Sequence, residues 1–297
     1  MTTTPQAVRS IGDLLRRWRK QRLLSQNDLA VKAEISARHL SFVENGRSEP
    51  SREVVLRLAE NLGLELRERN ELLLAAGYAP VYQHTSLQAP HMSAVRDMVR
   101  QVLAAHEPYP AVVLDRYWHR VEANAPAWLF GQGVAEELLR EPVNLMRVAL
   151  HPDGLAPRIA NLGEWRAHLL SRLRRQVTMT ADPDLVKLYD ELVRYPCDQH
   201  EPKIELPGPG DIAIPLRLRY EGRELAFFST VATFGTPLDI TVAELSIESF
   251  YPADTATAEL LRDATWPPAD TAAGAGIQYS SARRPRPAER AHRTEGR

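Results

Sequence analysis

Residues 35–53 read ISARHLSFVENGRSEPSRE, and this stretch decides the fold of the N-terminal part of the chain. Ser36 is a residue type that caps helix N-termini, and Leu40 and Val43 have the three-residue spacing of a buried helix face. Gly46 is a stop signal, because glycine readily takes the left-handed conformation that follows a helix C-terminus. The stretch therefore predicts a short helix that begins at Ser36 and ends before Gly46.

Four further helices are expected around this one, each with apolar residues at three- and four-residue steps and a capping or stop residue at an end. Their expected ranges are residues 7–22, Ser25 to about Ala33, Ser51 to Gly63, and Glu65 to Gly77. The first helix turns Ile11, Leu14 and Trp18 inward and leaves a basic outer face. All five helices are compact enough to form one helical domain over residues 7–77.

The second and third helices are joined by only a few residues, from Glu34 to Ser36. Helices joined so closely cannot lie antiparallel and must cross steeply, which is the helix-turn-helix geometry that presents the second helix to a DNA major groove. The first helix carries Arg9, Arg16, Arg17, Arg19, Lys20 and Arg22 against the single acid Asp13. This local charge hints at phosphate binding, although a solvated helix face would explain it equally well.

The helical domain also resembles a known family, the Cro/C1 or XRE class of helix-turn-helix repressors. The residues that carry the resemblance are Gln26, Leu29, Ala30, Leu40, Val43, the Glu44-Asn45-Gly46-Arg47 run and Pro50. One departure is Glu34, which stands where this motif often has glycine. A non-glycine residue there would adopt a left-handed backbone at a cost of about 1–2 kcal/mol.

The resemblance implies which residues touch DNA. Base edges would be read from exposed positions of the third helix, namely Ala37, Arg38, Ser41 and Phe42. Backbone phosphates would be held by Gln26, Ser36, His39, Asn45 and Arg47. The guanidinium of Arg38 suits bidentate bonds to guanine, with a phosphate contact as the alternative. Phe42 would either contact a thymine methyl group or simply pack.

The length of 297 residues predicts a second domain after the helical one. Residues 78–92 contain two prolines and no apolar periodicity, so they are expected to form a linker. A helix over residues 93–105 should follow. The residues expected on its buried face are Val95, Met98, Val99 and Val102.

Residues 111–123 alternate around a tight turn in the manner of two short strands, and Asn124 then opens a short helix with aromatic residues. This order resembles the opening of a PAS domain, which is an antiparallel sheet with helices that enclose a small-molecule pocket. Helical patterns follow over residues 144–177 and 185–196. Residues 212–252 then read as three antiparallel strands, with turns at Glu221-Gly222 and Gly235-Thr236-Pro237.

These stretches together resemble a narrower group, the MmyB-like transcription regulators, which combine an XRE-type N-terminal domain with a PAS-like ligand-binding domain. Runs that carry the resemblance include LLLAAGYAP, VLDRYWHRVEAN, NLMRVALHPDGL and STVATFGTPLDITVAELSIESFYPADTATAELL. The expected fold class is α+β. An all-α five-helix helix-turn-helix domain would be followed by a PAS-like domain of antiparallel sheet with helices over residues 93–265.

A PAS-like pocket with aromatic walls and few fixed charges favours an apolar or amphiphilic ligand, such as a fatty acid or a polyketide-like molecule. The candidate ligand residues are Trp118, Asn124, Trp128, Arg147, His151, Trp165, Phe227 and Phe228. Taken singly, each aromatic residue is better explained as part of the core, and only the set as a whole favours a ligand wall. The polar members would hold the ligand's head group.

Other site chemistry finds little support. Cys197 is the only cysteine, which excludes an internal disulfide and leaves either a redox sensor or a passive thiol. Asp198, His200 and Glu201 are close in sequence but lack a known metal-ligand spacing. With no phosphate-binding loop, complete dinucleotide fingerprint or Gly-x-Ser-x-Gly elbow, the protein is expected to be neither an enzyme nor a holder of a metal or cofactor.

The expected function is a sequence-specific DNA-binding transcriptional regulator, homodimeric on a double-stranded operator and modulated by the C-terminal ligand. The alternative is a small-molecule carrier or an enzyme whose helical domain is a protein-interaction module. Without a long apolar run or a signal peptide, the chain is expected to be cytoplasmic and without a membrane partner. Residues 266–297 are expected to be a disordered basic tail that adds DNA affinity or merely solubility.

Overall fold

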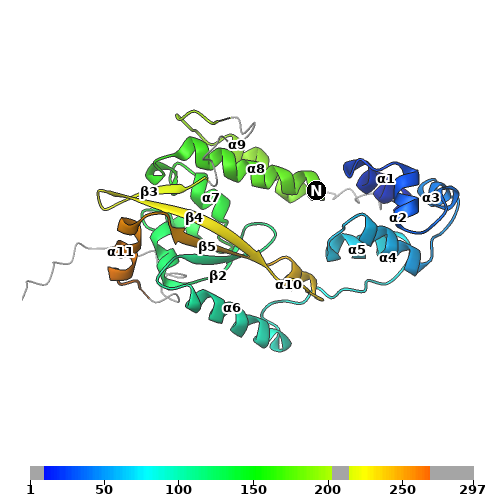
Figure 1. The fold of residues 1–297 in the computed structure, drawn as a ribbon, viewed down its shortest axis with the longest axis horizontal. Coiled ribbons are helices and arrows are strands. Elements are labelled where there is room, and N and C mark those ends of the chain that lie inside the picture. Colours follow the sequence, from blue (N-terminus) through cyan, green and yellow to red (C-terminus); the bar gives the residue numbers. More distant parts are fainter. Residues whose placement is uncertain (1–9, 203–213, 268–297) are drawn as a thin grey trace, which may run out of the picture.

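The computed structural model describes residues 10–202 and 214–267, so the start of the first expected helix and most of the basic tail lie outside the described residues. Its helical domain lies at one end of the molecule and a sheet with flanking helices at the other (Figure 1). The helical domain contains α1 (Ile11–Gln21), α2 (Gln26–Lys32), α3 (Ala37–Glu44), α4 (Arg52–Asn61) and α5 (Leu66–Ala75). The expected order of five short helices is confirmed.

Local sequence signals set where these helices begin and end. Ser25 and Ser36 cap α2 and α3, each accepting a hydrogen bond from the backbone N–H three residues later. Gly46 follows α3 with a φ of 68°. Glu34 takes a φ of 54° in the turn between α2 and α3, so a non-glycine residue does occupy the left-handed conformation there. The turn nevertheless closes, because Ile35 N–H donates to the Ala30 carbonyl at 3.0 Å.

The C-terminal domain is built on a five-stranded antiparallel sheet within the described residues, in the order β2-β1-β5-β4-β3. Its strands are β1 (Ala111–Leu114), β2 (Arg120–Ala123), β3 (Leu216–Tyr220), β4 (Arg223–Thr233) and β5 (Ser246–Pro252). The β3–β4 hairpin turns at Glu221 and Gly222, both with positive φ, as a tight two-residue hairpin requires. The expected PAS-like antiparallel sheet is therefore present.

Helices cover both faces of this sheet (Figure 1). On one face, Leu114, Phe227 and Phe250 pack with Trp165 and Leu188 in the larger core cluster. The helices of that side are α7 (Leu145–Leu150), α8 (Leu162–Thr180), α9 (Pro183–Val193) and α11 (Thr255–Asp263), with short 3-10 turns at Ala125–Phe130, Glu136–Leu139 and Ala156–Arg158. On the other face, α6 (Ser93–Ala105) follows a 3-10 turn at Pro90–Met92 and packs on β1 and β5.

Two expectations about this domain were wrong in detail. The buried face of α6 consists of Val99 and Leu103, whereas Met98 and Val102 are 47% and 42% exposed. The apolar periodicity of that helix allowed either face, and the sheet packs against only one of them. The last strand begins at Ser246, because Asp239 caps a short helix, α10 (Ile240–Ala243), inside the expected strand region.

The linker over residues 78–92 is fixed to both domains. The side-chain oxygen of Asn70 on α5 accepts hydrogen bonds from the backbone N–H groups of Val81 and Tyr82, at 3.0 and 3.1 Å. Further along, the Gln83 carbonyl accepts from Ile240 N–H at 2.8 Å, at the start of α10. The backbone of the linker is therefore hydrogen-bonded to the Asn70 side chain on α5 and to the backbone at the start of α10, so the linker is not a free tether.

Candidate nucleic-acid interface and ligand cavities

The exposed face of α3 is the candidate nucleic-acid interface. Leu40 and Val43 are fully buried against the other helices, which turns the opposite side of α3 to solvent. Arg38 is exposed there, and its guanidinium carbon lies 5.2 Å from the ring centroid of Phe42. Figure 1 shows α3 on the side of the helical domain that faces away from the C-terminal domain. A groove of DNA can therefore approach Arg38 and Phe42 without displacing the C-terminal domain.

The predicted phosphate contacts lie at the two ends of this helix and at the start of α2. Ser36 uses its hydroxyl oxygen to cap α3, accepting from His39 N–H at 3.1 Å. Asn45 is exposed but partly engaged, since its amide donates to the Ser41 carbonyl at 2.8 Å. Arg47 is exposed beyond the C-terminus of α3. The structure thus brings all nine predicted DNA-contacting residues to α3, its flanking turns and the first residue of α2, while leaving their contacts with DNA as predictions.

Glu44 belongs to the run that carries the resemblance, but no role was predicted for it, and its side chain organises this region. Its side chain is fully buried and accepts two hydrogen bonds from Arg19, at 2.7 and 2.8 Å, and one from the amide of Gln26 at 2.8 Å. Burial acts to raise the pKa of Glu44, but the hydrogen bonds from Arg19 and Gln26 outweigh it and hold the pKa below its ordinary value. Glu44 follows Leu40 by four residues, so its place on the buried stripe of α3 was a signal available in the sequence.

Two adjacent cavities lie beside the sheet in the described part of the C-terminal domain. The inner cavity, of about 70 Å³, is lined by Trp118, Trp165 and Glu248 among mainly apolar residues. A neighbouring cavity, of about 170 Å³, is lined by Asn124 and Trp128. The two cavities share four wall residues, which are Val112, Phe130, Leu145 and Val148.

The predicted ligand residues are only partly brought together. Trp118 and Trp165 line the inner cavity, and Asn124 and Trp128 line its neighbour. The amide of Asn124 is used structurally, because its oxygen accepts from Ala111 N–H at 2.8 Å and its nitrogen donates to the Tyr109 carbonyl at 2.8 Å. Both polar atoms of the Asn124 amide are therefore already hydrogen-bonded and are not free to bind a ligand head group.

The remaining four predicted ligand residues line neither cavity. Arg147 is held by Glu191 at 2.7 Å, and the ring of His151 meets Tyr195 edge to face. Phe227 is fully buried in the core, while Phe228 is 39% exposed on the opposite face of the sheet, so the prediction that both line one pocket was wrong. Neighbouring residues of a strand point to opposite faces, and that periodicity could have excluded one of the pair.

The two domains meet through a group of charged side chains, called here the interdomain ion cluster and made of Arg67, Glu68, Arg116, Asp182 and Glu244. Arg67 donates two hydrogen bonds to Glu244, at 2.6 and 2.7 Å. Arg116 donates to Glu244 at 2.8 Å and to Asp182 at 3.2 Å, and it lies 3.6 Å from Glu68. Burial acts to raise the pKa of Glu244, but its bonds to Arg67 and Arg116 lower it overall.

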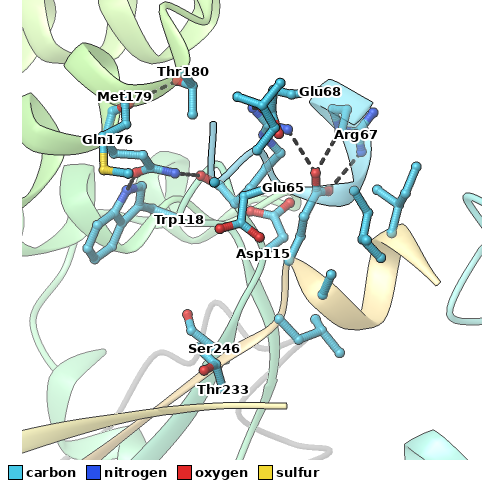
Figure 2. Close-up of a pocket in the computed structure, with 18 of the residues that line it drawn as sticks. Glu65, Arg67, Glu68, Asp115, Trp118, Gln176, Met179, Thr180, Thr233 and Ser246 are labelled. Carbon is cyan, nitrogen blue, oxygen red and sulfur yellow. Dashed lines mark hydrogen bonds and ion pairs between the residues drawn. The ribbon is translucent and has the colours of Figure 1, made fainter. Parts of the chain in front are cut away.

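A cleft of about 390 Å³ lies beside this cluster, lined by residues of both domains, and is called here the interdomain cleft. In Figure 2 the N-cap residue Glu65 and the α5 residues Arg67 and Glu68 come together with Asp115 and Trp118 of the C-terminal domain. Trp118 was predicted from the sequence, but the ion cluster was not. Arg67 and Glu244 are 177 positions apart, and no periodicity relates residues at that separation.

The α2 and α3 helices are joined by a short turn, and Arg38 is exposed on α3. Together with a sheet domain that contains apolar cavities, they define a helix-turn-helix protein with an attached domain of the ligand-binding kind. The chain belongs to the family of MmyB-like transcription regulators. The family model described as "MmyB-like transcription regulator ligand binding domain" matches residues 95–264, more than half of the chain, and a helix-turn-helix model matches residues 15–69. The protein is accordingly a DNA-binding transcription regulator, and its expected XRE-type and MmyB-like architecture is confirmed.

Further comparisons add no residue-level detail. A solved structure similar to this chain is the clp gene regulator ClgR from Corynebacterium glutamicum, with 23% identity, 36% of this chain and 99% of that chain covered, and a TM-score of 0.21. The search of curated proteins found no match. Among residues 10–202 and 214–267, no helix combines the length and apolarity needed to cross a bilayer. The same described ranges contain no group of three or more His, Cys, Asp or Glu side chains placed to hold a metal ion.

Proposed function

We propose that this regulator binds a palindromic operator as a homodimer, and that an apolar or amphiphilic ligand in the inner cavity changes its operator affinity. The observation that carries the ligand part is the position of Trp118. Its side chain lines the inner cavity and also lines the interdomain cleft. A ligand that moves Trp118 would therefore act on the junction between the two domains.

The walls of the inner cavity favour a mainly apolar ligand. Apart from Glu248, its lining side chains are apolar or aromatic. Glu248 is 5% exposed and is paired with Arg172 at 3.0 Å, which offers one polar end to an amphiphile. At about 70 Å³ the inner cavity alone is small for such a ligand. Rotation of a shared wall residue such as Phe130 would join it to the neighbouring cavity of about 170 Å³.

Hydrogen bonds connect Trp118 to the ion cluster. The indole N–H of Trp118 donates to the side-chain oxygen of Gln176 at 2.8 Å, and the amide nitrogen of Gln176 donates to the Arg116 carbonyl at 2.7 Å. Arg116 then reaches Glu68 and Glu244 through its guanidinium. Displacement of Trp118 would thus be transmitted to the side chain that contacts α5 of the helical domain.

The size of the required effect is modest. A ligand shifts a conformational equilibrium only by its difference in affinity for the two states, and a tenfold change in operator affinity needs about 1.4 kcal/mol. Loss of one partner from a buried ion pair costs about 3–5 kcal/mol. Weakening of the contacts of Arg116, whose side chain is 9% exposed, is therefore large enough to account for a regulatory change.

A homodimer is expected because one protomer offers only a small surface for contacting bases. Of the four predicted base-contacting residues, Arg38 alone can form a bidentate hydrogen-bonded contact with a base. One short helix contacts too few base pairs for tight specific binding, whereas two copies on a palindrome double the contacts. Size-exclusion chromatography with light scattering, with and without operator DNA, tests this part.

The ligand part is tested with decanoic acid as the probe and with DNA selected by repeated binding from a random pool. Fluorescence anisotropy should show an operator affinity that changes at least tenfold when the probe is added. Ala149 lines the inner cavity, so Ala149→Leu should abolish the response while retaining operator binding. Ala253→Leu, at an exposed position, is the matched control and should respond like the wild type. Equal responses in both variants would contradict the assignment of the ligand to this cavity.

A further inference from the structure

The interdomain cleft is larger than the inner cavity and its neighbour. Its volume of about 390 Å³ falls within the range of about 300–1,000 Å³ that small-molecule sites usually occupy. The helical domain contributes Trp18 and Glu68 to its wall, and the C-terminal domain contributes Arg116, Trp118 and Met179. Because each domain supplies only part of the wall, the cleft exists only while the two domains are in contact.

Three polar atoms in the wall of this cleft have no hydrogen-bond partner among the described residues. They are the indole nitrogen of Trp18, the Nε of Arg116 and the Oε2 of Glu68. Trp18 is 1% exposed, and the side chains of Arg116 and Glu68 are 9% and 8% exposed. A buried polar group left unpaired costs about 1–3 kcal/mol. All three atoms are themselves buried, so a molecule in the cleft would become their partner after a small rotation of the side chain that carries each one.

The lining residues define the chemistry of that molecule. Acidic and basic side chains occur in equal numbers, with Arg22, Arg67, Arg116 and Arg172 opposite Glu65, Glu68, Asp115 and Glu244. A wall of balanced charge has no net attraction for an ion. The unpaired groups are two N–H donors and one carboxyl oxygen, which suit a carbonyl or hydroxyl oxygen and a hydroxyl donor. The apolar remainder of the wall, including Trp118 and Met179, suits a ring.

We propose that the interdomain cleft is a second small-molecule site, which takes an uncharged ring compound with hydroxyl or carbonyl groups and thereby holds the helical domain against the C-terminal domain. The site is separate from the cavities of the proposed function and does not depend on them. A molecule bound here favours the docked arrangement by its difference in affinity for docked and separated domains.

The docked arrangement controls the position of α3 rather than its accessibility. The cleft contacts α1 and α5, and α3 lies on the far side of the helical domain with Arg38 exposed (Figure 1). The bound molecule therefore does not cover the reading face. In a dimer it would instead fix the direction and separation of the two copies of α3, on which the match to operator half-sites depends.

The probe for the experiment is 2-naphthol, an uncharged bicyclic phenol whose hydroxyl group both donates and accepts. Nitrogen-15 spectra of the full chain contain five tryptophan indole signals, which are assigned by single Trp→Phe substitutions. Trp18 lines the cleft but not the inner cavity, whereas Trp165 lines the inner cavity but not the cleft. Titration with 2-naphthol should move the Trp18 signal saturably.

Met179→Trp provides the test of location. Met179 lines the cleft and is 56% exposed, so a larger side chain there should fill the cleft without disturbing the fold. This variant should bind 2-naphthol at least tenfold more weakly. Val193→Trp, at a position on α9 that is 45% exposed, is the matched control and should bind with wild-type affinity.

The outcomes separate this proposal from the proposed function. A Trp18 signal that is unmoved at millimolar 2-naphthol, or that drifts without saturation together with every other indole signal, would overturn the proposal. Unchanged binding by Met179→Trp would do the same. The inner cavity is judged separately, by whether decanoic acid moves the Trp165 signal, so either site can fail while the other stands.

Discussion

The interdomain ion cluster predicts that Glu244→Gln separates the two domains. Glu244 accepts three hydrogen bonds, two from Arg67 and one from Arg116, and glutamine cannot replace its charge. Arg116 keeps its ion pair with Asp182 at 3.2 Å, so the free energy lost at Arg116 should be less than the full 3–5 kcal/mol of a broken buried pair. Arg67 is 28% exposed and is expected to contribute at most about 1 kcal/mol. The total is about 2–3 kcal/mol, or a docking equilibrium weakened about 30- to 140-fold.

Nitrogen-15 relaxation measures this directly, through the rotational correlation time of each domain. In the wild type the two domains should tumble together, and in Glu244→Gln the helical domain should tumble faster than the C-terminal domain. Glu191→Gln is the matched control, because Arg147 also binds Glu191 through two hydrogen bonds of 2.7 Å, but within the C-terminal domain and with both side chains more than a third exposed. If Glu244→Gln tumbles as one body, as Glu191→Gln should, the reasoning about the cluster is refuted.

Three further predictions concern the helical domain. Arg38→Ala should lose about 1–3 kcal/mol of discrimination between operator and scrambled DNA, whereas Arg47→Ala should weaken binding to both DNAs and lower the salt slope by about 1. Gel shifts with the two DNAs at several salt concentrations measure these changes, and equal losses on both DNAs for the two variants would exclude these roles. Gly12→Ala places a Cβ 2.4 Å from the Glu44 carbonyl oxygen and should cost about 1–3 kcal/mol in urea unfolding, while Gly131→Ala, with its nearest atom at 3.6 Å, should be nearly neutral. Because the pKa of Glu44 is lowered in the folded protein, its contribution to stability is present above the ordinary value of 4.5 and is lost as pH falls through the folded value. In that pH window the free energy of unfolding of Glu44→Gln should therefore fall less steeply than that of the wild type.

The local structure of the helical domain could be predicted because each helix boundary is set by residues near it. The caps at Ser25, Ser36 and Ser51 and the stop at Gly46 satisfy backbone groups within a few positions of themselves. The helix-turn-helix geometry then follows from the short connection. The strand pattern of the C-terminal domain was predictable for the same reason, since the two-residue turn at Glu221-Gly222 fixes the register of the β3–β4 hairpin.

The ligand site was predicted less well, because it depends on which face each element buries. The aromatic side chains of Trp118 and Trp165 do line the inner cavity, but Phe228 points to the other face and Arg147 is paired with Glu191. A polar residue near a predicted sheet has many local partners available to it. Only packing decides that Asn124 binds backbone groups instead of facing a cavity.

The sequence by itself determined the five helices, the turn that crosses α2 and α3, the antiparallel strands and the exposed position of Arg38. These features rest on hydrogen bonds and periodicities that span a few residues. The tertiary structure alone decided that Glu44 is paired with Arg19, that Trp118 borders both the inner cavity and the interdomain cleft, and that Arg67 and Arg116 meet at Glu244. These contacts join side chains from 25 to 177 positions apart. Those between Arg67 and Glu244 form only when the two domains pack together.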